Sequence, residues 1–173
     1  MRGLLPRCFE YLFTQMAGIK SKHQLQSRNI ADTTSFEGIS SYDQEMFRDE
    51  RVVEIDFEVK CSYVEIYNET IFDLLDSVCR NRLNIREDKG LTFLENCTEV
   101  HVATLKEVSD VIRRGQDNRH VAATNMNSES SRSHSVFTAL IRTQTKLNDG
   151  SKVVRSSRFH IVDLAGSERV KDT

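Results

Sequence analysis

Long apolar runs are absent from this sequence of 173 residues. No stretch approaches the roughly 20 residues that a membrane-spanning helix needs, and the N-terminus lacks the apolar core of a secretory signal. We therefore expect no membrane insertion and a cytoplasmic or nuclear protein. The length fits one domain, because a chain of this size can bury a sizeable core.

Paired cysteine motifs and a strong net charge are also absent. The four cysteines, Cys8, Cys61, Cys79 and Cys97, form no CxxC pair, which favours reduced thiols over disulfides or a zinc site. The formal net charge is only -2. Composition therefore gives no reason to expect nucleic acid or an anionic membrane as a partner.

Two segments have the apolar spacing of amphipathic helices. In residues 3–16 the shared face would carry Leu5, Phe9, Leu12, Phe13 and Met16, with Pro6 in the first turn. A second helix is predicted from Thr104, whose hydroxyl and Glu107 form the pattern of a capping box. Its core-facing residues would be Leu105, Val108, Val111 and Ile112.

Residues 15–51 are polar and aperiodic. A stretch with so little apolar area cannot offset the entropy of ordering it against a core. We therefore predict a long surface loop or insert here.

Strand patterns fill much of the remaining chain. Apolar and polar residues alternate strictly over residues 53–63, and shorter strands are expected on both sides of Gly90. Between these regions, Ile71, Leu74 and Leu75 share a helical face over a short span. Residues 135–145 and 155–166 are apolar runs separated by the turn sequence Asn148-Asp149-Gly150, which predicts an antiparallel hairpin of the two most buried strands.

The stretch "NMNSESSRSHSVFTALI", residues 125–141, places many hydroxyls, an arginine and a histidine ahead of one hairpin strand. Serine and asparagine cluster in ordinary turns because their side chains bond nearby backbone groups. The alternative is a site that grips a metal-bound phosphate. The loop by itself leaves both interpretations open.

The other hairpin strand runs into "VDLAGSER", residues 162–169. A carboxylate at the carboxyl end of a central strand lies where open α/β sheets bind ligands, and the glycine that follows lets backbone approach closely. Asp163 is therefore a candidate for holding Mg²⁺ directly or through water, with Gly166 nearby. Taken alone, this motif is equally consistent with Asp163 capping a turn that Gly166 ends.

Together, "NMNSESSRSH" and "VDLAGSER" resemble the two nucleotide-sensing switches of the kinesin motor domain. The segments "GLLPRCFEYLF", "VEIYNETIFDLLD" and "VAATNMN" are similar to the kinesin pattern in the same order. The resemblance covers nearly the whole chain, residues 1–173, except the polar stretch, which looks longer than the usual kinesin connection. It implies an α/β fold, with a central mainly β sheet that includes the antiparallel hairpin and helices on both faces.

The resemblance also implies roles for individual residues in binding ATP and Mg²⁺. Ser131 would contact the metal or its water shell, and Asp163 would hold a metal-bound water. Asn127 would reach toward the γ-phosphate, and the Gly166 N–H would donate to it. Ser130 would place the lytic water. Arg132 would pair with Glu168 and latch the two switches together when the site closes.

Each role has a plainer alternative. The Arg132 and Glu168 side chains could form an ordinary surface ion pair, worth about 0 to 1 kcal/mol. His134 is expected to anchor a loop and not to act as a catalytic base, and Ser128 and Ser133 to be solvated or structural. A solvated helix face is a better expectation than a basic patch for the arginines of the second helix, which are Arg113, Arg114 and Arg119.

None of the seven glycines begins the GxxxxGK[ST] loop that cradles phosphates. Kinesins carry that loop ahead of a segment like "GLLPR", and their main microtubule-binding helices follow the second switch. We therefore expect part of a cytoskeletal motor that moves along microtubules or the spindle by hydrolysing ATP, with this chain alone inactive. Any dimerisation would use segments outside it. The alternative is a truncated product that acts as a non-catalytic interaction module.

Overall fold

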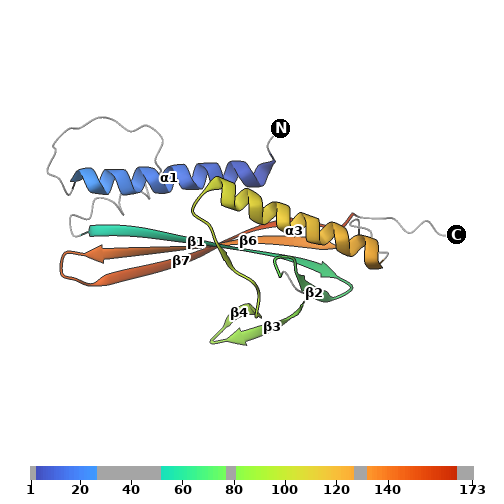
Figure 1. Cartoon of the computed structure of the whole chain (residues 1–173). Helices are drawn as coiled ribbons and strands as arrows, with labels where there is room; N and C mark the ends of the chain where they lie inside the picture. Colours follow the sequence, from blue (N-terminus) through green and yellow to red (C-terminus); the bar gives the residue numbers. More distant parts are fainter. Residues whose placement is uncertain (1–2, 27–51, 77–80, 127–131, 167–173) are drawn as a thin grey trace.

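The computed structural model describes residues 3–26, 52–76, 81–126 and 132–166, with the backbone path alone for residues 22–26 and 120–126. The elements are α1 (Leu4–Gln26), β1 (Val52–Tyr67), β2 (Thr70–Asp73), β3 (Arg82–Asp88), β4 (Leu91–Glu95), β5 (Val100–His101), α3 (Leu105–Met126), β6 (His134–Leu147) and β7 (Lys152–Asp163). The strands form one sheet in the order β4-β3-β2-β1-β6-β7, and β5 pairs with β1 (Figure 1).

The long strand β1 is the centre of this sheet. It pairs antiparallel with β6 from Ile66 opposite His134 to Val52 opposite Leu147. Its other edge is shared by β2, near Tyr67, and by β5, near Cys61. The alternation predicted for residues 53–63 is confirmed in its second half, where Val59, Cys61 and Tyr63 are buried on the core face. Nearer the start of the strand Val53 is 51% exposed, and Ile55 and Phe57 are half-buried.

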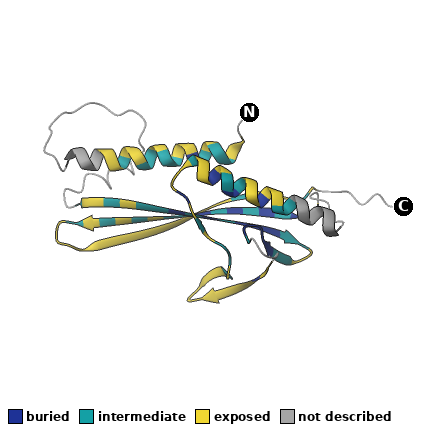
Figure 2. Cartoon of the chain, in the orientation of Figure 1, coloured by how far each residue is buried: buried dark blue, intermediate teal, exposed yellow. Residues whose placement is uncertain are grey.

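Both described helices pack on the same face of the sheet (Figure 1). Their apolar residues meet β1 and β6 in one core, whose buried members include Phe9, Val59, Val108, Val111 and Phe137. Burial is concentrated in the second half of β1 and the first half of β6 (Figure 2). The prediction of helices on both faces is therefore wrong for the described residues. Against the opposite face lies the β3–β4 hairpin, where Arg158 donates to the Thr92 carbonyl over 3.4 Å.

Helix α1 is longer than its apolar pattern predicted. It continues to Gln26, so the prediction of a loop from residue 15 was wrong for residues 15–26. Met16 still packs against the core, and Lys20 donates to Asp56 over 2.8 Å with its ammonium above the Phe57 ring. The hydrogen bond from Lys20 lowers the pKa of Asp56. Long-range contacts from β1 thus stabilise a segment whose own sequence is polar.

Residues 70–73 form strand β2, so the helical interpretation of Ile71, Leu74 and Leu75 was wrong. Asn68 and Glu69 both adopt positive φ, 46° and 57°, and turn the chain back onto β1 in a tight hairpin. Two successive left-handed residues match the twist of the flanking strands. Leu74 and Leu75, which follow β2, are fully buried. The short strands predicted around Gly90 are confirmed as β3 and β4.

Strands β6 and β7 form the predicted antiparallel hairpin around Asn148-Asp149-Gly150, with Gly150 at a φ of 83°. The expectation that both are deeply buried holds only for the first half of β6, where Ser135, Phe137 and Ala139 are buried, and is wrong for β7. In the described chain β7 is an edge strand, and Val154, Val162 and the following Leu164 are 46%, 51% and 70% exposed. Its apolar sequence therefore does not reflect burial within the described residues.

The start of α3 has the predicted capping box. The Glu107 carboxylate accepts from the backbone N–H groups of Ala103 and Thr104, over 2.6 and 3.1 Å. In return the Thr104 hydroxyl accepts from the Glu107 N–H over 3.2 Å. These hydrogen bonds lower the pKa of Glu107 and satisfy N–H groups that a helix start leaves without intrahelical partners.

Replacing Thr104 by alanine should lower the free energy of unfolding by about 1 kcal/mol, because the cap acceptor is lost. Urea titration of the 173-residue chain, followed by circular dichroism, measures this difference. Thr92→Ala, at an exposed position of β4, serves as the control. A loss no larger at Thr104 than at Thr92 would show that the capping box does not stabilise α3.

Candidate functional site

The two motifs singled out in the sequence meet at one end of the sheet. The chain enters β6 at His134, and β7 ends at Asp163, directly beside this point. Ser135 and Asp163 form the last pair of the β6–β7 ladder. The same end of the sheet lies under the C-terminal half of α3 (Figure 1). Topology alone therefore places the end of the serine-rich motif, at Ser135, beside Asp163.

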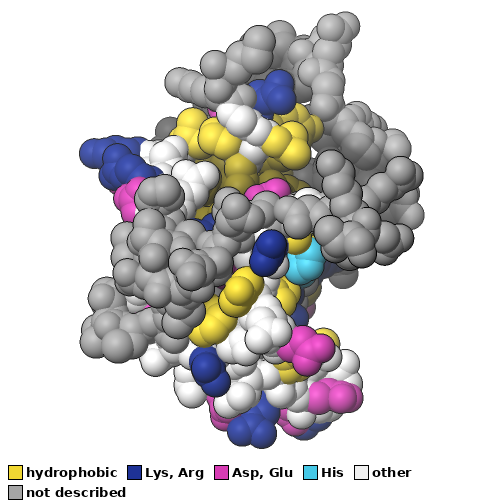
Figure 3. Space-filling view, turned by 90° about the vertical axis from the view of Figure 1, so that its right-hand side faces the viewer, with side chains coloured by type: hydrophobic (Ala, Val, Ile, Leu, Met, Phe, Trp, Pro, Cys, Tyr) yellow, Lys and Arg dark blue, Asp and Glu magenta, His cyan; other side chains and the backbone are white. Residues whose placement is uncertain are grey.

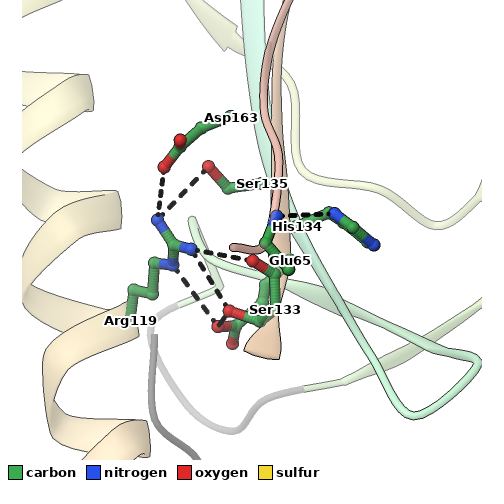
Figure 4. Close-up of polar contacts among 7 residues, drawn as sticks. Glu65, Arg119, Ser133, His134, Ser135 and Asp163 are labelled. Carbon is green, nitrogen blue, oxygen red and sulfur yellow. Dashed lines mark hydrogen bonds and ion pairs between the residues drawn. The ribbon is translucent and has the colours of Figure 1, made fainter. Parts of the chain in front are cut away.

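Arg119 of α3 is the hub of the polar contacts at this end (Figure 4). Its guanidinium donates to the Asp163 carboxylate over 3.1 Å and to the Ser135 hydroxyl over 3.5 Å. It also donates to the carbonyl and the hydroxyl of Ser133, both over 3.2 Å. One side chain thus ties the helix to Ser133 just before β6, to Ser135 within it and to the last residue of β7.

Glu65 of β1 completes this cluster. Its carboxylate lies 3.5 Å from the Arg119 Nε atom and accepts from the Ser133 hydroxyl over 2.8 Å. The Glu65 and Arg119 side chains are only 4% and 15% exposed, whereas Asp163 is 70% exposed. A buried carboxylate requires a charged and hydrogen-bonding partner, so Glu65 and Arg119 together form the fixed part of the cluster. Asp163 is its solvent-facing end.

His134 holds the chain that follows β7. Its Nδ1 atom accepts from the Ala165 backbone N–H over 2.8 Å. The expectation that this histidine anchors a loop is therefore confirmed. Ser133, expected to be solvated or structural, is structural, because it is 1% exposed.

Three of the residues assigned roles from the sequence lie within the described chain. Arg132 and Gly166 are exposed, and Asp163 has the contacts given above. The other four, Asn127, Ser130, Ser131 and Glu168, lie outside the described residues. The predicted pair of Arg132 with Glu168 therefore stays a prediction, as do the phosphate and metal contacts.

The arginines of α3 behave differently from one another. Arg113 pairs with Asp110 at the surface, as a solvated helix face predicts. Arg114 donates to the Leu75 carbonyl, and Asn118 donates to the Leu74 carbonyl over 2.7 Å. Arg114 is nevertheless exposed, whereas the Arg119 side chain is only 15% exposed. The solvated-face prediction was therefore wrong for Arg119.

Glu65 and Arg119 were missed as a pair, although the sequence carries a signal for both. Glu65 follows Val59, Cys61 and Tyr63 at strand spacing, so the alternation places a carboxylate on the core face. Arg119 follows the buried Gly115 by four residues and therefore lies on the inward face of its helix. Opposite charges at two inward positions indicate a buried ion pair.

Viewed from this end, the described side chains are mixed: hydrophobic ones gather in the upper part and again near the middle, and charged ones of both signs lie above, between and below them (Figure 3). Within the described residues, no group of three His, Cys, Asp or Glu side chains could hold a metal ion. No helix in this part of the chain is long and apolar enough to cross a membrane. Among the described side chains of this face, basic ones form no broad patch (Figure 3).

Comparison with known families gives a match to the kinesin motor domain over residues 1–173. The chain belongs to this family. As a kinesin it is 40% identical over 175 residues to kinesin-like protein KIN-12B of Oryza sativa subsp. japonica. It is likewise 41% identical over 175 residues to kinesin-like protein KIF15 of Strongylocentrotus purpuratus. The family resemblance drawn from the switch motifs is therefore confirmed.

The kinesin fold is confirmed by a solved structure described as that of a fast kinesin. That chain is 35% identical to this one, with a TM-score of 0.68 over 98% of this chain and 38% of its own length. The alignments cover 99% of this chain and 13% of the rice protein. They cover 100% of this chain and 10% of the sea urchin protein. The kinesin chain described here thus spans a small part of the length of its relatives.

Proposed function

We propose that this chain is the nucleotide-sensing part of a microtubule motor, which couples binding and hydrolysis of Mg-ATP to movement along microtubules. The observation that carries the proposal is the junction of Ser135 with Asp163, which brings the two motif segments to one end of the sheet. Phosphoryl transfer depends mainly on positioning and on electrostatic stabilisation. Two segments anchored to the same strand ends suit that requirement.

The proposed roles follow the family motifs. Asn127 and the Gly166 N–H would contact the γ-phosphate, and Ser130 would orient the attacking water. Arg132 and Glu168 would form the latch between the two segments. A bidentate pair of guanidinium and carboxylate is favourable for a latch, because it forms only in one relative orientation.

Asp163 suits a role beside Mg²⁺. Its carboxylate is 70% exposed at the end of β7, and Mg²⁺ bound to a nucleotide keeps several waters and uses few protein carboxylates. Ser131 would be the second protein contact. When bound, the metal would neutralise phosphate charge, while Arg119 would fix the side from which the Asp163 carboxylate approaches.

Glu168→Ala in the full-length protein tests the latch. ATP binding should stay within about twofold of wild type, whereas microtubule-stimulated turnover should fall by about a hundredfold, because the pair stabilises only the closed site. Steady-state hydrolysis and equilibrium nucleotide binding measure the two quantities. Glu54→Ala, at an exposed position of β1, is the matched control. Equal turnover in the two variants would contradict the latch.

The mass of the endogenous polypeptide separates this proposal from the alternative of a non-catalytic interaction module. An antibody raised against residues 20–48 should detect a band much larger than 19.9 kDa. A band near 19.9 kDa would favour the interaction module. Co-sedimentation of the detected band with microtubules, lost on addition of ATP, would support the motor.

A further inference from the structure

The β6–β7 ladder ends just before the segment that carries Gly166. Ser135 opposite Asp163 is its last pair, and Leu164 and Ala165 continue beyond the strand. A backbone N–H that leaves a ladder needs another acceptor when it stays partly buried. The His134 ring supplies one, because its Nδ1 atom lies 2.8 Å from the Ala165 nitrogen. The side chain thus extends the ladder by one hydrogen bond.

The two serines that flank His134 make their contacts on the opposite face of the strand. Ser133 and Ser135 point toward Arg119 of α3, whereas the His134 ring points away from it (Figure 4). Alternation along a strand accounts for this division, since successive side chains point to opposite faces. Residues 133–135 therefore hold a helix on one face and the chain after β7 on the other.

We propose that His134 is a positioning residue for the Gly166 backbone N–H. By fixing the Ala165 peptide, the ring limits the directions in which the next N–H can point. The inference rests on the proposed function, in which that N–H contacts the γ-phosphate. A ring that accepts at Nδ1 is neutral and carries its proton on Nε2, so His134 acts here as an acceptor and transfers no proton.

Three substitutions of His134 distinguish the effect of the hydrogen-bond acceptor from the effect of the ring's volume. Phenylalanine keeps a ring and removes the acceptor. Asparagine places its Oδ1 atom the same number of bonds from Cα as Nδ1, so it can accept from Ala165 in the same position. Glutamine carries its oxygen one bond further out, so it does not reproduce that position.

The hydrogen bond itself is tested by NMR on the 173-residue chain. The ¹⁵N spectrum of His134 should show an unprotonated Nδ1 and a protonated Nε2. In His134→Phe the Ala165 amide should exchange with solvent about fivefold to tenfold faster, as expected for one lost hydrogen bond. In His134→Asn it should stay within about twofold of wild type. A proton on Nδ1, or unchanged exchange in His134→Phe, would overturn the proposal.

The positioning role is tested by steady-state kinetics of the full-length protein. His134→Phe and His134→Gln should lower microtubule-stimulated kcat about tenfold or more, with the KM for ATP within about twofold. His134→Asn should restore kcat to within about twofold of wild type. Wild-type turnover in the phenylalanine variant, or equal loss in the phenylalanine and asparagine variants, would overturn the role. Absence of ATP hydrolysis by the wild-type protein would instead contradict the proposed function, and the NMR result would still decide the hydrogen bond.

Discussion

Arg119→Leu should lower the free energy of unfolding by about 3 to 5 kcal/mol, because it leaves the Glu65 carboxylate buried without its cation. Glu65 is 4% exposed, and the Ser133 hydroxyl cannot replace a guanidinium charge. The variant also removes the contacts that tie α3 to Ser135 and Asp163. Urea unfolding of the 173-residue chain, followed by circular dichroism, measures the change.

Arg113→Leu is the matched control for this prediction. Arg113 lies on the same helix, is 72% exposed at its side chain and pairs with Asp110 at i,i+3 spacing. Such a pair contributes about 0.2 to 0.5 kcal/mol, so the control should unfold nearly like wild type. Equal stability of the two leucine variants would show that the buried pair contributes no more than a surface one.

A double variant separates the charge from the packing. Arg119→Leu combined with Glu65→Leu removes both buried charges, and replacing both partners of a buried ion pair is often close to neutral. The double variant should therefore regain about 1 to 3 kcal/mol over Arg119→Leu alone, a coupling expected for residues in contact. No recovery would assign the loss to the shape of the site instead of to the unpaired carboxylate.

The second large effect is expected at Gly115, where α3 crosses the Tyr63 side chain of β1. A Cβ atom built on this glycine would overlap the Tyr63 ring, whose own position is buried in the core. Gly115→Ala should destabilise the chain by about 1 to 3 kcal/mol through overpacking. This loss is expected even though alanine favours a helix interior over glycine by about 1 kcal/mol.

Gly18→Ala provides the opposite result in the same protein. Gly18 lies in α1 with nothing within 4 Å of a built Cβ atom, so alanine there should stabilise by about 0.4 to 1 kcal/mol. Tyr63→Val should lessen the penalty of Gly115→Ala, since the smaller side chain makes room. Urea midpoints measure these differences for Gly18→Ala, Gly115→Ala, Tyr63→Val and the double variant that combines the last two. A Gly115→Ala chain that is as stable as Gly18→Ala would contradict the overlap.

Periodic segments were predictable from sequence because their pattern is set by burial on one side. The alternation of β1 over residues 59–63 and the apolar face of α3 both turned out as predicted, and both lie in the same core. The helical prediction for residues 70–75 failed because three apolar side chains fit either a helix or the end of a hairpin. The deciding fact was the left-handed backbone of Asn68 and Glu69, which is a weak signal in residues other than glycine.

The site was predictable as a pair of motifs but not as a network. Asp163 and His134 could be singled out from their motifs, whereas the partner of Asp163 could not. Arg119 lies 44 residues from Asp163 in sequence and 54 from Glu65, by subtraction of their numbers. Only the crossing of α3 over the ends of three strands brings the three together, and one sequence carries no direct record of that crossing.

The pairing of β1 with β6 also bears on how the chain folds. The β1–β2 and β6–β7 hairpins join residues close in sequence, whereas the longest ladder joins residue 52 to residue 147. The chain must close such a long loop, at a cost in entropy, before the stabilising contacts can form. Non-local pairing is therefore slow. During synthesis, one edge of β1 therefore lacks its native partner until the ribosome has completed β6. We expect that interval to be the time at which the chain is most prone to aggregation and most in need of a chaperone.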